Sequence, residues 1–551
     1  MPRGKLMSEK PAKASAAVAN NTRIIFVTGG VISGIGKGIA AASIGNILKA
    51  RGYSVFIQKL DPYLNIDPGV LSPYEHGEVY VTDDGGETDL DLGHYERFLD
   101  QSLTRDSNYT SGRICKMVFD NERRGKYQGK TVQIIPHFTN EITRVINTTI
   151  SKHQLDFHIV EIGGTVGDVE SNAFIIAASQ YGFQNPANTF YIHITYVPWL
   201  SATKEHKTKP TQHSLSLLAS NGIRANMVLL RAHTDVGREI CQKIANFSFL
   251  DEQNVVSLYD VDNVYEIPLY LDSKKVGISI LEHFNLPKRK ANMSEWENFI
   301  NKTRAVTNQK VHVAMVGKYT ELEDSYKSIR EALIISGAYN QANIEFKWIS
   351  AETLSATNLE STLRDVDGVV VLPGFGERGF EGKLLTVDYT RKHQIPTLGI
   401  CFGMQAMTIN QARLKGISDA TSREFASSGT FILDLIPGKA TGVSGGTLRL
   451  GLDQVQIHPD TLAYRIYQAE LIRERSRHRY EVNPQYVAQL QDEEFIFSGA
   501  HPQSQLIEIC ELKNHPFYIG VQYHPEFSAR PLRPHRLFNA FIRAAAARHG
   551  G

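Results

Sequence analysis

The sequence has few cysteines, no long apolar run and no excess of either charge. Its four cysteines, Cys115, Cys241, Cys401 and Cys510, are far apart, so neither a disulfide framework nor a CxxC zinc site is predicted. No apolar stretch approaches the ~20 residues that a membrane helix needs. With 59 basic and 58 acidic residues, the chain has no general electrostatic attraction to nucleic acid. These absences predict a cytoplasmic protein that binds neither membranes nor nucleic acid.

The order of apolar and helical stretches predicts an α/β protein with mostly parallel sheets, in more than one domain. Strands are expected at 23–28, 53–57, 157–161, 191–196, 227–230, 311–316, 368–372 and 397–400, and helices at 35–51, 324–340 and 535–549. The predicted domain limits are a disordered leader (1–21), a first α/β domain (22–285), a lysine-rich linker (286–309) and a second α/β domain (310–548). Trp296 and Phe299 indicate a short docked helix within the linker.

A glycine-rich loop, GGVISGIGKG at 29–38, joins the first expected strand to the first helix. Glycines let backbone N–H groups approach phosphate closely, and Lys37 adds a full positive charge. The spacing from Gly30 to Gly36 is one residue longer than in the usual phosphate loop. Gly38 stands where a serine or threonine would bind Mg²⁺. The loop therefore predicts a nucleotide site whose metal is held by carboxylates elsewhere.

Two carboxylates are candidates for that metal site. Glu161 ends an apolar strand, where an unpaired carboxylate is costly, and Asp91 lies in an acidic run that a solvated loop explains equally well. Lys204, Lys207 and Lys209 form a further basic cluster after the strand at 191–196. A solvated surface run is the simpler interpretation of these lysines, and a second polyphosphate site is the alternative.

The second expected domain carries a cysteine at a strand-to-helix turn, in GICFGMQ at 399–405, and His524 and Glu526 follow far downstream. A helix N-terminus favours thiolate, a histidine can take the thiol proton, and a carboxylate can orient the imidazole. Cys401, His524 and Glu526 thus predict acyl transfer. The N–H of Phe402 is one expected oxyanion donor, and the turn Leu372 to Gly376 offers a second. Arg479 and Glu424 could hold the charged groups of a glutamine substrate.

Several motifs in this order resemble the CTP synthase family from about residue 22 to 545. They are GGVISGIGKG (29–38), KLDPYLNIDPG (59–69), GETDLDLGHYERF (86–98), VEIGGTVGD (160–168), KTKPTQHS (207–214), GICFGMQ (399–405), RHRYEVN (477–483) and HPEF (524–527). The resemblance implies a Rossmann-like synthetase domain with a deviant phosphate loop, followed by a class I glutamine amidotransferase domain. It implies a ligase that phosphorylates UTP with ATP and aminates it to CTP with ammonia from glutamine.

The resemblance also implies ligand sites, Mg²⁺ as metal, GTP as activator, CTP as feedback inhibitor, and a homotetramer. Catalysis is assigned to Cys401, His524 and Glu526, and Mg²⁺ to Asp91 and Glu161. The implied ATP contacts are Gly34, Ile35, Gly36, Lys37, Gly38, Ile39, Asp91, Tyr259, Asp260 and Val261. The implied UTP or CTP contacts are Ser33, Asp168, Val169, Glu170, Lys207, Thr208, Lys209, Pro210, Thr211, Gln212 and Lys243. The implied glutamine contacts are Gly374, Phe402, Gly403, Met404, Gln405, Glu424 and Arg479.

Some positions depart from the family pattern. Pro373 stands where the oxyanion turn usually has its first glycine, and proline has no N–H to donate. If that N–H is the donor, glutamine hydrolysis should fall by about 10²–10³-fold; Gly374 could donate instead. Gly34 replaces a frequent serine, and the segment from Glu424 to Gly445 is shorter than in many members, which puts a GTP-dependent contact there in question.

Two alternatives remain open at this point. One is an amidotransferase of the cobyric-acid type, against which the KTKPTQ and GETDLDLGHYERF motifs argue. The other is a regulatory or filament-forming homologue with weakened catalysis, which only the Pro373 shift favours.

Overall fold

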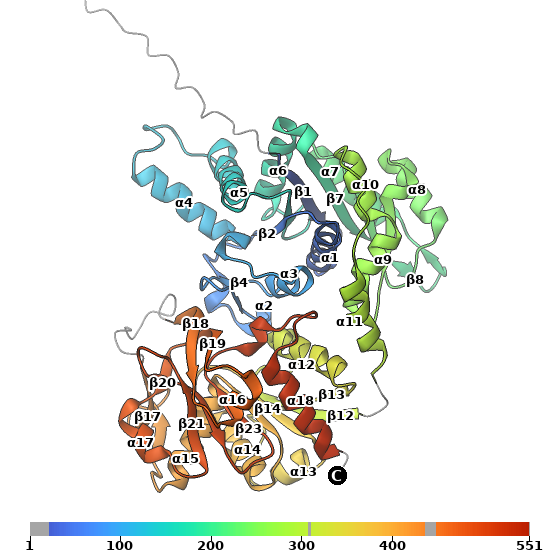
Figure 1. Cartoon of the computed structure of the whole chain (residues 1–551). Helices are drawn as coiled ribbons and strands as arrows, with labels where there is room; N and C mark the ends of the chain where they lie inside the picture. Colours follow the sequence, from blue (N-terminus) through green and yellow to red (C-terminus); the bar gives the residue numbers. More distant parts are fainter. Residues whose placement is uncertain (1–20, 307–309, 436–447, 550–551) are drawn as a thin grey trace, which may run out of the picture.

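The computed structural model describes residues 21–306, 310–435 and 448–549. Two α/β halves lie one above the other, the N-terminal half in blue to green and the C-terminal half in yellow to red (Figure 1). The expected leader lies outside the described residues, apart from Asn21, and so does the part of the expected shortened segment from 436 to 445. The described part contains no helix that is both long and apolar enough to cross a membrane.

The N-terminal half is built on a seven-stranded sheet in the order β11-β10-β7-β1-β6-β2-β5, in which neighbouring strands run parallel. Its strands are β1 (Arg23–Gly29), β2 (Val55–Asp61), β5 (Asn108–Thr110), β6 (Phe157–Ile162), β7 (Thr189–Tyr196), β10 (Met227–Ala232) and β11 (Val255–Tyr259). Alternate residues of β1 point to opposite faces: Ile25 and Val27 pack with α1 (Lys37–Ala50) and α3 (Asp91–Leu99), whereas Ile24 and Phe26 pack with α5 (Thr139–His153) and α6 (Asn172–Gln184). Burial on both faces explains why the strand reads as one apolar run.

The helices of this half are α1 (Lys37–Ala50), α2 (Pro73–His76), α3 (Asp91–Leu99), α4 (Ser111–Arg123), α5 (Thr139–His153), α6 (Asn172–Gln184), α7 (Lys209–Ser220), α8 (Arg238–Ser248), α9 (Ile267–Ser273) and α10 (Val276–His283). Two small hairpins pair β3 (Tyr80–Val81) with β4 (Glu87–Thr88) and β8 (Trp199–Leu200) with β9 (Glu205–His206).

The C-terminal half is built on a nine-stranded mixed sheet in the order β13-β12-β14-β15-β23-β22-β21-β18-β19. Its strands are β12 (Lys310–Gly317), β13 (Asn343–Ser350), β14 (Gly368–Val371), β15 (Thr397–Ile400), β18 (Arg449–Ile457), β19 (Leu471–His478), β21 (Phe495–Ala500), β22 (Ile507–Leu512) and β23 (Tyr518–Val521). A small sheet joins β16 (Ala420–Ser422), β17 (Thr430–Leu435) and β20 (Tyr480–Val482). Five neighbouring strands of this sheet run parallel, so their carboxyl ends share one edge: β13, β12, β14, β15 and β23.

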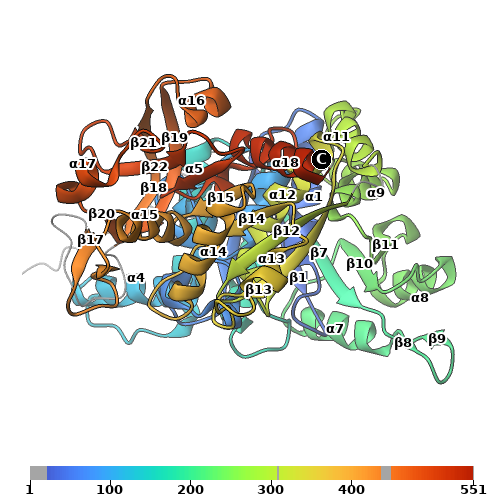
Figure 2. The same cartoon turned by 90° about the horizontal axis from the view of Figure 1, so that it is seen from below.

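The helices of this half are α12 (Lys327–Tyr339), α13 (Leu359–Leu363), α14 (Phe380–Lys392), α15 (Phe402–Leu414), α16 (Leu462–Tyr467), α17 (Val487–Leu490) and α18 (Arg536–His549). One face of the sheet packs against α14 and α15, and the other against α12 and α18. Seen from below, α14 and α18 lie on opposite sides of the strands β12 and β14 (Figure 2). The α/β architecture expected from the sequence is confirmed.

The two halves share buried surface. Within the expected linker, α11 (Ser294–Arg304) buries Trp296, Phe299 and Ile300 in the core around α1, and the indole N–H of Trp296 donates to Tyr265 O at 2.8 Å. This stretch is therefore largely a packed helix. The domain limits themselves stay a prediction.

An ion cluster also joins the halves. The guanidinium of Arg475 on β19 pairs with Glu96 on α3 at 3.0 Å, and both side chains are almost fully buried (1% and 0% exposed). Arg530 pairs with the same carboxylate. A buried ion pair is retained only with good geometry, because both charges lose their hydration. The cluster therefore fixes the position of one half against the other.

Candidate active sites

Cys401 occupies a strained turn between β15 and α15. Its φ of 52° and ψ of −101° are unusual for a residue with a side chain, and the side chain is only 2% exposed. The turn closes tightly because Gly403 approaches β14: a Cβ on Gly403 would stand 2.2 Å from Val371 O. The Sγ donates to Arg477 O at 3.9 Å and accepts from the amide of Gln522 at 3.6 Å. The geometry places one thiol at the N-terminus of a helix.

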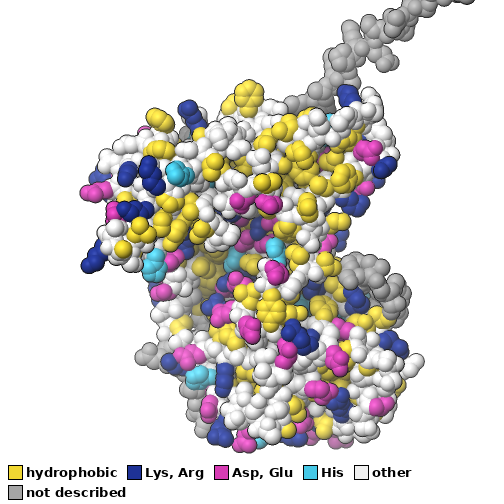
Figure 3. Space-filling model, turned by 180° about the vertical axis from the view of Figure 1, so that it is seen from behind, with side chains coloured by type: hydrophobic (Ala, Val, Ile, Leu, Met, Phe, Trp, Pro, Cys, Tyr) yellow, Lys and Arg dark blue, Asp and Glu magenta, His cyan; other side chains and the backbone are white. Residues whose placement is uncertain are grey.

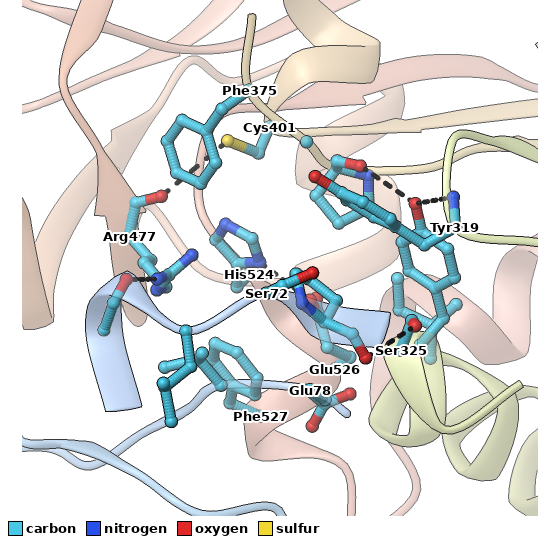
Figure 4. Close-up of a pocket in the computed structure, with 18 of the residues that line it drawn as sticks. Ser72, Glu78, Tyr319, Ser325, Phe375, Cys401, Arg477, His524, Glu526 and Phe527 are labelled. Carbon is cyan, nitrogen blue, oxygen red and sulfur yellow. Dashed lines mark hydrogen bonds and ion pairs between the residues drawn. The ribbon is translucent and has the colours of Figure 1, made fainter. Parts of the chain in front are cut away.

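His524 lies between Cys401 and Glu526 (Figure 4). Its Nδ1 lies 2.7 Å from Glu526 Oε1, and the buried Nε2 has no conventional hydrogen-bond partner among the described residues. Burial disfavours the imidazolium, but the Glu526 carboxylate and Cys401 outweigh it and raise the pKa of His524 to about 10. The backbone of this segment is also fixed, because His524 N–H donates to Arg475 O at 2.7 Å. A nucleophile, a base and an orienting carboxylate are thus aligned.

The turn after β14 faces this thiol. A Cβ on Gly374 would stand 3.7 Å from the ring of Phe402, and no described group accepts a hydrogen bond from Gly374 N–H. As the first residue of α15, Phe402 has an N–H that the helix itself cannot satisfy. Two free N–H groups beside Cys401 are what an oxyanion needs. Pro373 precedes this pair of donors and lies outside it.

The other residues expected to hold glutamine surround the same turn. Glu424 accepts from Gly376 N–H at 2.6 Å; burial raises its pKa, and Lys318 and Arg479 counteract that effect. The side chain of Gln405 instead points toward the protein interior, where it donates to Tyr480 O at 3.1 Å and Gln522 Oε1 at 3.3 Å. The side chain of Gln405 therefore contacts residues behind the cavity and does not point into it.

A cavity of about 350 Å³ connects Cys401 with the N-terminal half. Its lining combines Cys401, His524 and Glu526 with residues 69–73, Glu78 and Val79 of the N-terminal half. Figure 4 shows Ser72 and Glu78 on the side of the cavity opposite Cys401. The cavity therefore has walls from both halves of the chain. Acidic and histidine side chains lie on the surface of the narrow region between the two halves (Figure 3).

The glycine loop forms a second cavity, of about 720 Å³, lined by residues 33–39 together with Asp91 and Glu161. Gly34 and Gly36 have φ of 67° and 90°, so the loop uses the freedom of glycine. Lys37 donates to Gly164 O at 2.8 Å. Burial lowers its pKa, and Glu161 opposes that shift. The loop thus presents backbone N–H groups and one lysine to the cavity.

The position of Asp91 explains the missing phosphate-loop hydroxyl. A Cβ on Gly38 would stand 2.3 Å from Asp91 Oδ1, so a serine or threonine there would clash with this carboxylate. Asp91 therefore occupies the space that a Ser or Thr side chain would need. The carboxylate is also held by Lys59, whose Nζ lies 2.5 Å from Asp91 Oδ2 and 2.8 Å from Asp89 Oδ1.

The carboxylates of this cavity suit Mg²⁺. Glu161 is buried and accepts from the hydroxyl of Tyr95, burial raises its pKa to about 8, and Asp91 adds repulsion. A cation between the two carboxylates would relieve both effects. Mg²⁺ is commonly held by one or two carboxylates, with its remaining ligands from nucleotide phosphates and water.

Comparison with known proteins follows this division into two sites. Residues 23–286 match the model of the CTP synthase N-terminus, and residues 321–544 match that of class I glutamine amidotransferases. A CTP synthase of Mycoplasmopsis pulmonis is 53% identical over 526 residues, which cover 95% of this chain and 98% of that protein. One of Geobacillus kaustophilus is 47% identical over 528 residues, covering 95% and 99%. This chain belongs to the CTP synthase family.

Among solved structures, the glutaminase domain of a Trypanosoma brucei CTPS with bound acivicin is 30% identical, with a TM-score of 0.41, and covers 43% of this chain and 94% of that one. As a CTP synthase, this enzyme uses ATP and converts UTP to CTP with nitrogen from glutamine. The first expected function is thus confirmed, and the cobyric-acid-type alternative is not supported.

Only some of the residues expected to bind nucleotides line the phosphate-loop cavity. Residues 34–39 and Asp91 line the phosphate-loop cavity, together with Ser33, but residues 259–261 are not among its lining. Residues 259–261 lie at the end of β11, at the sheet edge, where Asp260 pairs with Arg231. The expected UTP contacts other than Ser33 are not part of the cavity lining either: 168–170 lie on the loop before α6, 207–212 at the start of α7, and Lys243 within α8.

Sequence reasoning missed several residues of both sites. Lys59 holds Asp91 and Asp89, Gln522 donates to Cys401, and Lys318 and Lys383 donate to carbonyls of the turn 372–376. Lys59 lies within the KLDPYLNIDPG motif, which carries the family resemblance but assigns no function to this lysine. For Gln522 and Lys383 only the folded chain brings the side chain to the site.

Proposed function

We propose that Cys401 attacks the carboxamide of glutamine, that His524 takes and returns the proton, and that Glu526 orients the imidazole. The attack forms a thioester and releases ammonia, and water then releases glutamate. The N–H groups of Gly374 and Phe402 would stabilise the oxyanion. The observation that carries this proposal is the alignment of the three side chains in one cavity.

Glutamine would be held around this turn. Glu424 would meet the α-amino group and Arg479 the α-carboxylate, with Gly403, Met404 and Gln405 shaping the pocket. Arg479 lies close enough to Glu424 to oppose the rise in its pKa that burial causes, which supports a paired site for a zwitterion. Ammonia would then cross the shared cavity toward the N-terminal half.

In the N-terminal half, ATP would bind with its phosphates on residues 34–39 and its base near Tyr259, Asp260 and Val261. Asp91 and Glu161 would hold Mg²⁺, which supplies charge neutralisation for the phosphates. Lys37 would stabilise the phosphoryl group as it moves to O4 of UTP, and ammonia attack at C4 with loss of phosphate gives CTP. UTP or inhibitory CTP would contact Ser33, 168–170, 207–212 and Lys243.

We further propose GTP as activator, CTP as feedback inhibitor, a homotetramer and a cytoplasmic location. These proposals rest on membership of the CTP synthase family. The domain limits 22–285, 286–309 and 310–548 stay part of the proposal.

The deciding experiment measures CTP formation from UTP, ATP and Mg²⁺ in two arms, one with glutamine and one with ammonium chloride, each with and without GTP. CTP in both arms, faster with GTP in the glutamine arm only, is the expected result. CTP with ammonium alone would place a defect in glutamine hydrolysis or its coupling. A folded, nucleotide-binding protein that makes CTP in neither arm would contradict the proposed roles.

A further inference from the structure

A lysine is buried behind the turn that faces Cys401. Lys383 lies in the first turn of α14, is 0% exposed, and donates from Nζ to Leu372 O, the carbonyl that opens the turn. Its Nζ also lies 4.7 Å from the centroid of the Phe402 ring and 3.8 Å from where a Cβ on Gly374 would stand. One side chain therefore contacts both residues whose N–H groups face the thiol.

This is an unfavourable place for a cation. The first turn of a helix carries the positive end of its dipole, and burial removes hydration. Among the described residues no carboxylate forms an ion pair with Lys383, and Lys318 lies on the same side. Burial and then Lys318 lower the pKa of Lys383 to about 7, and Cys401 and Glu424 oppose the shift. An apolar side chain such as methionine would fill this space without the cost of a buried charge.

We propose that Lys383 is a positioning residue for glutamine hydrolysis, which holds the oxyanion turn through Leu372 O and places positive charge behind it. The inference rests on the proposed roles of Cys401, Gly374 and Phe402. Negative charge at the active site, first on the thiolate and then on the oxyanion, favours the ammonium form. The lysine therefore interacts more strongly with the transition state than with the resting enzyme. Such an interaction affects kcat and leaves the binding of glutamine nearly unchanged.

The test compares Lys383→Met and Lys383→Gln with wild type in the full-length enzyme, by glutaminase kcat and KM, by CTP formation from ammonium, and by thermal unfolding. Lys392→Met, on the exposed part of the same helix, is the matched control. For Lys383→Met we expect kcat to fall by about 10²-fold, near the value for one lost oxyanion interaction, with KM and the ammonium arm within about 2-fold. Lys383→Gln, whose amide can still donate to a carbonyl, should lose less.

The outcomes separate this inference from the proposed function. A wild-type enzyme without glutaminase activity would contradict the proposed function itself. An active wild type together with unchanged kcat in both Lys383 variants would overturn only the role of Lys383. So would a rise of KM alone, or equal losses in the glutamine and ammonium arms, which would show a general structural effect. If Lys383→Met does not fold, Lys383→Gln decides by the same readouts.

Discussion

The phosphate loop and the Cys401 turn are two solutions to one problem, which is to place reactive groups where a strand meets a helix. The loop after β1 is open: Val31 and Ile32 are 37% and 44% exposed, and Gly34 and Gly36 take positive φ. The turn after β15 is closed around a thiol that is 2% exposed. The loop must admit a large anion, whereas the turn must hold one atom in a fixed direction.

The two sites also differ in how completely one chain builds them. The proposed nucleophile, base, orienting carboxylate and oxyanion donors all come from the C-terminal half and line or adjoin one cavity. In the nucleotide site the loop, the carboxylates and Ser33 line one cavity, but the other expected UTP contacts are not part of that lining. The comparison predicts that changes at the Cys401 turn affect one activity, and that changes at the loop affect the whole reaction.

The largest effect is expected from Cys401→Ala. Removing the nucleophile should lower glutamine-dependent CTP formation by at least about 10³-fold, and ammonium-dependent formation should stay within about 2-fold. Both rates are measured on the same preparation, with Cys115→Ala as control. Loss of both activities in a folded variant would show that the two sites are not separate.

Lys37→Ala tests the other side of the comparison. Because ammonia cannot bypass the activation of UTP, both arms should fall together, by about 10²–10³-fold for a lost charge contact in the transition state. Lys49→Ala, at the far end of the same helix α1, serves as the control. Substantial CTP formation by Lys37→Ala would contradict its phosphate role.

Glu96→Gln tests the link between the two regions. Arg475 and Arg530 would keep their charges but lose their buried carboxylate, which should lower the free energy of unfolding by about 3–5 kcal/mol. The measurement is the unfolding midpoint in denaturant, followed by both activity arms. A change of less than about 1 kcal/mol would mean that water or backbone groups compensate the cluster.

Pro373→Gly should have a small effect. Since Gly374, one residue later, carries the free N–H beside Phe402, restoring a glycine at 373 should change glutaminase kcat by less than about 3-fold. A gain of about 10²-fold would instead show that the N–H missing at Pro373 limits the natural enzyme.

The last prediction concerns pH. The pKa of His524 rises from 6.5 to about 10 in the folded chain, so its charged form stabilises the fold fully below pH 6.5, and this contribution is lost as pH rises through about 10. Wild type should therefore lose more thermal stability between these pH values than His524→Gln. Equal losses would indicate that the imidazole is neutral in the folded enzyme.

The sequence predicted the strands and both reactive turns well because these depend on local patterns. β1, α1, β15 and α18 lie within one or two residues of their expected positions. The partners that support each site depend on strand order. Lys59 stands directly opposite Glu161 in the pairing of β2 with β6, and only that register brings an ammonium to the acidic group. Tyr259 ends β11 at the edge of the sheet, and its neighbour Asp260 pairs with Arg231, whose Nε lies 3.9 Å from where a Cβ on Gly36 would stand; no local pattern indicates this connection.

The helix α3 connects the two proposed sites. Its nine residues span about 13 Å, with Asp91 at the phosphate loop and Glu96 at Arg475. Arg475 in turn donates to Phe527 O, next to the orienting carboxylate Glu526. One short helix therefore contacts both the proposed phosphate site and, through Arg475, the segment next to the proposed glutaminase base.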